Sequence, residues 1–154
     1  MVSVDAVADY ILAKVDRGEG DSITHLKLQK LIYYCQAWYL AFYDKPLFDE
    51  PIQAWAHGPV VPVLWHRFKH YGWQAIDPEK LATNPLAELD ERARDMIDEV
   101  WATYGSLSGS ELRRLTHKEP PWKDAYGDRA PGEACYEEIP RKAMAAYFKP
   151  RIPT

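Results

Sequence analysis

The chain has 154 residues, of which 47% are apolar and 27% are charged, and its formal net charge is −4. This balance is typical of one folded domain, and it excludes a disordered chain and a globally basic nucleic-acid binder. The longest stretch without Asp, Glu, Lys or Arg is residues 51–66, which contains three prolines, so no membrane-spanning helix is expected. Cys35 and Cys135 are isolated thiols and the N-terminus carries no basic leader, which favours a cytoplasmic protein.

Two helices are expected in the first 45 residues. Apolar residues recur at the helical period over residues 3–17, with Ser3 as the N-cap and Gly18 as the stop. A longer apolar stripe then begins at the N-cap Thr24 and runs toward Pro46, which disfavours helix at the residue before it.

One flank of this second helix combines cationic and aromatic side chains. At about 100° per residue, Lys27, Tyr34 and Trp38 fall on the same flank. Lys30 is predicted to lie beside them, further toward solvent. The flank is therefore a polar and aromatic edge rather than a pure core face.

An extended segment and a short helix follow. Small apolar residues alternate with larger side chains over residues 52–57, which permits a short β element. Gly58-Pro59 is expected to form a turn. Pro62 suits the first turn of a helix, and Gly72 is its expected end.

The next expected helices are separated by a glycine. A loop over residues 73–85 precedes a clean helical stripe over 86–104, which Gly105 ends. Ser108-Gly109-Ser110-Glu111 is a capping-box pattern, and it predicts a helix that runs to about His117.

Two prolines and a last helix complete the chain. Pro120 and Pro121 are expected to break the preceding helix, and a final helix is expected to begin at Pro140. The sum predicts a mainly α, compact single-domain bundle of about five to seven helices. At most a short extended or β element is expected near residues 52–57.

The sequence contains no pattern that is specific for catalysis, a metal or a cofactor. His66 and His70 share a helix face, but cationic residues between them oppose a divalent ion, so a solvated pair is expected. We therefore expect no cofactor, no metal and no catalytic residue. Two alternatives stay open: a small enzyme that uses His57 or His117 with Lys27, and a DNA-binding regulator that uses Arg113 and Arg114.

Aromatic, cationic and turn-forming residues instead gather in three clusters. Such residues are enriched at protein–protein contacts, which favours a groove for a peptide or protein partner. The alternative is that they pack loops onto the helix bundle. The residues expected to form or support a partner surface are Lys27, Lys30, Tyr34, Trp38, Trp55, His57, His117 and Trp122, with Gly58, Pro59 and Pro121 shaping the turns.

At these clusters the chain resembles a known family. The matching segments are Leu26–Tyr34 with Gln36-Ala37-Trp38, Pro46–Trp55 leading into His57–Pro62, and Leu107–Leu112 followed by Leu115-Thr116-His117 and Pro121-Trp122. In order and spacing they resemble the SocA-like antitoxin family, the Panacea domain, with its phage-associated GepA-like proteins. The resemblance covers residues 3–148 as one domain and leaves 149–154 as a C-terminal tail. Many relatives have Tyr-Gly-Pro-Val where this chain has His57-Gly58-Pro59-Val60.

The resemblance implies a cytoplasmic antitoxin that neutralises a cognate protein toxin by direct binding. As in the family's namesake, it also implies a proteolytic adaptor that delivers the toxin to the ClpXP protease. Such a protein needs no enzymatic activity, no membrane and no nucleic acid. The net negative charge of the chain would suit a basic toxin and speed association through steering.

Overall fold

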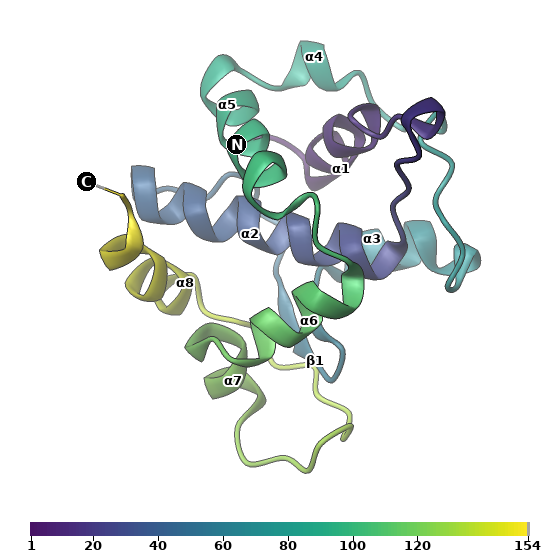
Figure 1. Ribbon diagram of the computed structural model, residues 1–154. Helices are drawn as coiled ribbons and strands as arrows, with labels where there is room; N and C mark the ends of the chain where they lie inside the picture. Colours follow the sequence, from purple (N-terminus) through teal and green to yellow (C-terminus); the bar gives the residue numbers. More distant parts are fainter. Residues whose placement is uncertain (154) are drawn as a thin grey trace.

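The helix α2 (His25–Tyr43) runs through the middle of the molecule, with other elements packed around it (Figure 1). Every residue from Leu28 to Ala37 is buried in this computed structural model, which describes residues 1–153. The sequence predicted one apolar stripe, but α2 contacts α1, α5, α6, α8 and a β-hairpin. Within residues 1–153, no helix is both long and apolar enough to cross a membrane.

The described residues form eight α-helices and one small antiparallel sheet, which confirms the mainly α fold. The helices other than α2 are α1 (Val4–Ala13), α3 (Pro62–Phe68), α4 (Pro85–Glu88), α5 (Glu91–Tyr104), α6 (Gly109–His117), α7 (Pro120–Tyr126) and α8 (Arg141–Phe148). The strands are β1 (Gln53–Trp55) and β2 (Gly58–Val60), and 3-10 turns cover Arg17–Glu19, Lys69–Tyr71 and Lys149–Arg151.

Several element boundaries differ from the sequence prediction. Helix α1 begins at its cap Ser3 but ends at Ala13, before Gly18. The predicted 86–104 helix is two helices, because the Asp90 side chain accepts a hydrogen bond from the Ala93 N–H and starts α5 anew. Pro120 follows the end of α6 as expected, but it also occupies the first turn of α7, where its missing N–H costs nothing.

The β-hairpin corrects the predicted turn at Gly58-Pro59. Gly58 and Pro59 belong to β2, and the two-residue turn is Ala56-His57. Trp55 pairs with Gly58 and Ala54 with Pro59. Gly58 has a φ of +112°, which few residues other than glycine adopt, so the chain can leave the turn directly into the strand.

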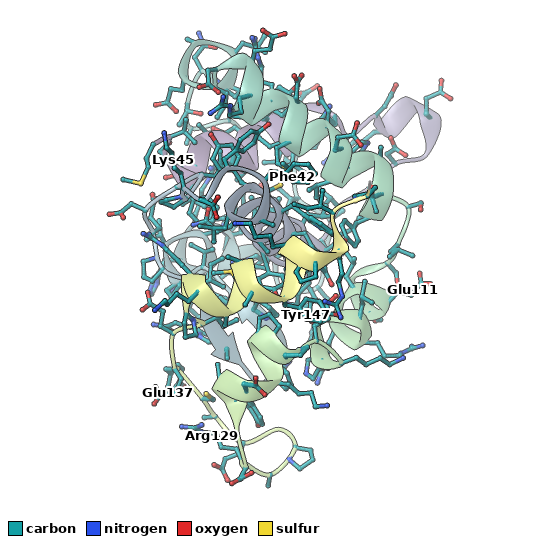
Figure 2. The ribbon with its side chains drawn as sticks, turned by 90° about the vertical axis from the view of Figure 1, so that its left-hand side faces the viewer. Phe42, Lys45, Glu111, Arg129, Glu137 and Tyr147 are labelled. Atoms are coloured by element: carbon teal, nitrogen blue, oxygen red, sulfur yellow. The ribbon has the colours of Figure 1, made fainter. Side chains whose placement is uncertain are left out.

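A segment near the C-terminus covers the outer edge of β1. The Ala54 N–H donates to the Glu137 carbonyl at 2.7 Å, and the Ile139 N–H donates to the Ile52 carbonyl at 2.8 Å. Figure 2 shows the loop that leads into this segment, where Arg129 lies 3.8 Å from the Glu137 carboxylate. The same view shows Tyr147 on α8, which packs along α2.

Two buried glutamines on α2 hold the extended segments that flank the hairpin. The Gln36 amide donates to the Phe48 carbonyl at 2.8 Å and accepts from the Leu47 N–H at 2.7 Å. The Gln29 amide oxygen accepts from the Val61 N–H at 2.8 Å. Buried backbone groups need hydrogen-bond partners, and these extended segments have no neighbouring strand at those positions among the described residues. The glutamine amides supply the partners instead.

Helix α3 is tied to α1 by a buried charge. The Asp9 carboxylate, fully buried on α1, pairs with the Arg67 guanidinium and accepts the Thr83 N–H at 2.8 Å. Arg67 also donates to Asp5 at 3.0 Å. These bonds fix the orientation of α3, and with it the side chains at positions 65 and 69.

Candidate functional site

A groove with a volume of about 590 Å³ opens where the N-terminal ends of α2 and α6, the hairpin and α3 meet. In Figure 1 the start of α2 and the start of α6 lie together on the right, above the hairpin. We call it the tryptophan groove, after Trp55, Trp65 and Trp73, which line it. Its lining also includes Ser108, Gly109 and Ser110 at the start of α6.

The three tryptophans come from separate segments. Trp55 ends β1 and its ring centroid lies 5.6 Å from that of Trp65 on α3. Trp73 follows α3 and is 83% exposed. The Lys69 ammonium lies 5.2 Å from the Trp65 ring centroid, in the geometry of a cation–π contact. The wall therefore combines a large apolar surface with a positive charge.

Positive charge dominates the groove. Within residues 1–153, the lining contains Lys30, Lys69 and Arg113 but no aspartate or glutamate. Two histidines also line it. Burial lowers the pKa of His25 to about 4, and burial followed by the nearby Arg113 charge lowers the pKa of His57. Both imidazoles are therefore mainly neutral at pH 7, and the charge comes from Lys69 and Arg113, with a partial charge on Lys30.

Lys30 forms part of the groove floor and is completely buried, which corrects the prediction that it faces solvent. Its ammonium donates to the Pro59 carbonyl at 3.2 Å. A Cβ added to Gly58 would lie 2.5 Å from the Lys30 Cε, so β2 packs directly on this side chain. Helical periodicity gave no sign of this, because the covering strand comes about 28 residues later in the chain.

The Lys30 ammonium has no counter-charge among the ion pairs of residues 1–153. Burial, and then the positive charge of Arg113, lowers its pKa from the ordinary 10.5 to about 7. Burial disfavours the charged form because the protein interior solvates an ammonium less well than water does.

His117, Pro121 and Trp122 hold the hairpin rather than line the groove. The His117 Nε2 lies 2.9 Å from the Ala56 carbonyl, and the Trp122 indole N–H donates to the Trp55 carbonyl at 2.8 Å. The His117 and Trp122 ring centroids are 3.8 Å apart. Pro121 is buried in the first turn of α7. The cluster of His117, Pro121 and Trp122 therefore holds in place the strand that carries Trp55.

Lys27, Tyr34 and Trp38 share one flank of α2, as predicted, but they lie outside the tryptophan groove. The Lys27 ammonium donates a hydrogen bond at 2.5 Å to the carbonyl of Gly105, the residue that follows α5. Tyr34 stacks on Tyr104 with centroids 4.0 Å apart, and the Trp38 N–H donates to the Tyr104 hydroxyl at 2.9 Å. The cluster of Lys27, Tyr34 and Trp38 therefore joins α2 to the end of α5.

Tyr34 also reaches a buried carboxyl group. Its hydroxyl donates to Glu119 at 2.9 Å, where α6 passes into α7. Burial raises the pKa of Glu119 to about 7, although the hydrogen bond from Tyr34 acts in the opposite direction. Burial is also the main cause that raises the pKa of Tyr34 far above its ordinary value. This pair belongs to the core and not to an open site.

Neither alternative function gains a site from these positions. Lys27 is bonded to Gly105 and does not line the groove, so it does not join His57 there. Arg113 and Arg114 are exposed neighbours on α6, but Arg113 alone of the two lines the groove. No group of three or more His, Cys, Asp or Glu side chains that could hold a metal occurs among residues 1–153.

Sequence reasoning found Trp55 and His57 but missed the opposite wall of the groove. Trp65 lies within the helix expected to begin at Pro62, and Trp73 lies within the loop expected over residues 73–85, and neither was named as a candidate. The available signal was the i, i+4 spacing of Trp65 and Lys69, which puts an aromatic ring and a cation about one helical turn apart at the C-terminal end of α3.

Comparison with known proteins places the chain beside a family of antitoxins. The sequence profile described as "Antitoxin SocA-like, Panacea domain" matches residues 28–123. Antitoxin SocA of Caulobacter vibrioides (strain NA1000 / CB15N) is 30% identical over 130 residues, which cover 79% of this chain and 69% of that protein. No solved structure matches the chain.

Proposed function

Since the chain belongs to the SocA-like antitoxin family, which is defined by the Panacea domain, we propose that it neutralises a cognate protein toxin by binding it directly. The tryptophan groove is the proposed contact surface, with Trp55 and His57 among the residues that touch the toxin. Lys30, Gly58, Pro59, His117, Pro121 and Trp122 support this surface from beneath.

The observation that supports this proposal best is the exposure of tryptophan on a fixed frame. Trp73 is 83% exposed, and Trp55 and Trp65 are half-buried on elements held by a part-buried bond from Trp122 and a buried bond to Gln29. Exposed tryptophan next to arginine is the composition of binding hot spots. A frame that is already ordered loses little entropy on binding, which favours a tight complex.

The proposed role is that of a binding module in the cytoplasm and not that of an enzyme. We extend the proposal to delivery of the bound toxin to the ClpXP protease, because the sequence resembles a family whose namesake acts in this way. The half-life of the toxin in cells with and without ClpX, at constant antitoxin level, separates delivery from masking. A half-life that does not depend on ClpX leaves masking as the mechanism.

The first experiment is to express the product of the adjacent gene alone and together with this chain. A product that stops growth alone and permits growth with the antitoxin is the cognate toxin. Titration calorimetry with the two purified proteins then gives the affinity of the complex. Growth arrest that persists under co-expression of both proteins contradicts the antitoxin role for that pair.

The groove itself is tested with Trp73→Ala, which removes an exposed side chain and should leave the fold intact. We expect weaker toxin binding with an unchanged melting temperature. Leu86→Ala is the matched control, since Leu86 is a large apolar residue that is 65% exposed on α4, outside the groove lining. Equal affinity of both variants and the wild type would place the toxin elsewhere.

A further inference from the structure

The charge of the tryptophan groove is opposite to that of the chain. The chain has a net charge of −4, yet in the described residues the groove lining has three cationic side chains and no acidic one. We propose that the groove binds an extended acidic segment of the toxin that also carries an apolar or aromatic side chain. This inference rests on the proposed function and adds the chemistry of the bound segment to it.

The cations of the groove are left without acidic partners, while a neighbouring cation on α3 is paired. Arg67 pairs with Asp5 and Asp9, and Lys69 lies half a turn further along the chain. None of the ion pairs within residues 1–153 includes Lys69, Arg113 or Lys30. Carboxylates of a partner would supply the missing counter-charges.

Lys30 adds a partial positive charge to the floor of the groove without occupying its space. The ammonium is buried beneath Gly58 and donates one hydrogen bond, to the Pro59 carbonyl. With a pKa of about 7, the amine is charged in roughly half of the molecules at pH 7, and a carboxylate that enters the groove would favour the charged form.

The aromatic walls of the groove suit an apolar side chain next to the carboxylates. Trp55 and Trp65 lie 5.6 Å apart by ring centroids, and Trp73 exposes most of its surface. A volume of about 590 Å³ is within the range of about 300–1,000 Å³ that encloses a bound ligand. A short chain segment with one apolar anchor fits this combination of walls and charge.

Nucleic acid is a poorer match for the same cations. A duplex presents a long array of phosphates, and a protein that binds it usually neutralises many of them along a basic face. Here three cations are confined to one groove on a chain with an excess of acidic residues. A short acidic segment meets the groove without placing further negative charge against the acidic surface.

The test uses two adjacent arginines of α6. Arg113→Glu reverses a charge in the groove lining, whereas Arg114→Glu reverses a charge that is also exposed but lies outside the lining. We expect Arg113→Glu to raise the Kd for the toxin at least tenfold and Arg114→Glu to change it less than twofold. The wild-type Kd should rise as NaCl increases from 50 to 300 mM, because salt screens exposed charges.

A charge swap identifies the acidic partner. Cross-linking of the complex locates the toxin segment in the groove, and Asp or Glu to Lys substitutions in that segment should restore binding to Arg113→Glu. Circular dichroism of each variant establishes that it is folded. Equal effects of the two arginine variants, or a groove segment without acidic residues, would overturn the inference while toxin neutralisation stands.

Failure of the proposed function gives a different result. A wild-type chain that binds no toxin in the same assay overturns both the function and the inference that rests on it. A fluorescein-labelled 20-base-pair duplex is the competing probe. Salt-sensitive duplex binding that Arg113→Glu abolishes, and that exceeds toxin binding, would replace the acidic segment with DNA.

Discussion

Replacing Lys30 with methionine removes a buried cation and keeps an unbranched side chain of similar length. Lys30 is fully buried, and burial lowers its pKa from the ordinary 10.5 to about 7. At pH 6 the amine is therefore charged in both the folded and the unfolded chain, and the folded chain carries the cost of burying it. Methionine carries no such cost at any pH.

The expected gain in stability follows from the pKa. At about 1.4 kcal/mol per pH unit, the difference between 10.5 and about 7 corresponds to roughly 5 kcal/mol at pH 6. The variant loses the hydrogen bond to the Pro59 carbonyl, which costs about 1 kcal/mol, and some packing. We expect Lys30→Met to raise the free energy of unfolding at pH 6 by about 3 kcal/mol.

The stability difference between Lys30→Met and the wild type should depend on pH. Between pH 7 and 10.5 the folded wild type binds fewer protons at Lys30 than the unfolded chain, so its stability rises with pH relative to the variant. Urea unfolding at pH 6, 8 and 9.5 measures the difference in the free energy of unfolding between Lys30→Met and the wild type. Other groups titrate in both proteins, so their contributions cancel in this difference. The advantage of methionine should vanish near pH 9. A difference that does not change with pH would refute the reasoning.

The remaining predictions are measured by urea unfolding. Gly58→Ala should lower the free energy of unfolding by about 2–4 kcal/mol, because its φ is +112° and its Cβ would lie 2.5 Å from Lys30 Cε. Trp122→Ala, in the core, should cost about 3–5 kcal/mol, whereas the exposed Trp73→Ala should stay within about 0.5 kcal/mol. Gln36→Leu should cost about 2–4 kcal/mol, because it leaves a buried backbone N–H and carbonyl unpaired.

Each of these predictions has a clear contrary result. Wild-type stability of Gly58→Ala would mean that β2 does not pack tightly on Lys30. Equal unfolding energies for Trp122→Ala and Trp73→Ala would contradict their different burial. Loss of toxin binding by Trp122→Ala without loss of stability would move this residue from the support of the hairpin to the contact surface.

The features that local geometry controls were predicted well. The caps Ser3 and Thr24 and the capping box of Ser108 and Glu111 form as expected, because each depends on hydrogen bonds between residues about three apart. The common flank of Lys27, Tyr34 and Trp38 also follows from helix geometry alone. Helix α7 was missed because Pro120 ends one helix and also starts the next.

The site was predicted less completely than the fold. Trp55 and His57 lie next to a recognisable turn, so their cluster was visible in the chain. Trp65, Lys69 and Trp73 join them only because α3 folds back against the start of α2 and the hairpin. Contacts between segments that are far apart in the chain leave no periodic signal, so the opposite wall was not found.

The sequence by itself determined the mainly α class, most helix starts and the antitoxin family, because periodicity, caps and ordered motifs are written along the chain. The tertiary structure decided which cations are paired with acidic residues and which are collected in the groove. Arg67 forms an ion pair with Asp9 on α1, whereas Lys30 is covered by β2 and has no ion-pair partner within residues 1–153. Electrostatic interactions depend on distance and burial in space, so a net charge of −4 does not reveal a positive groove.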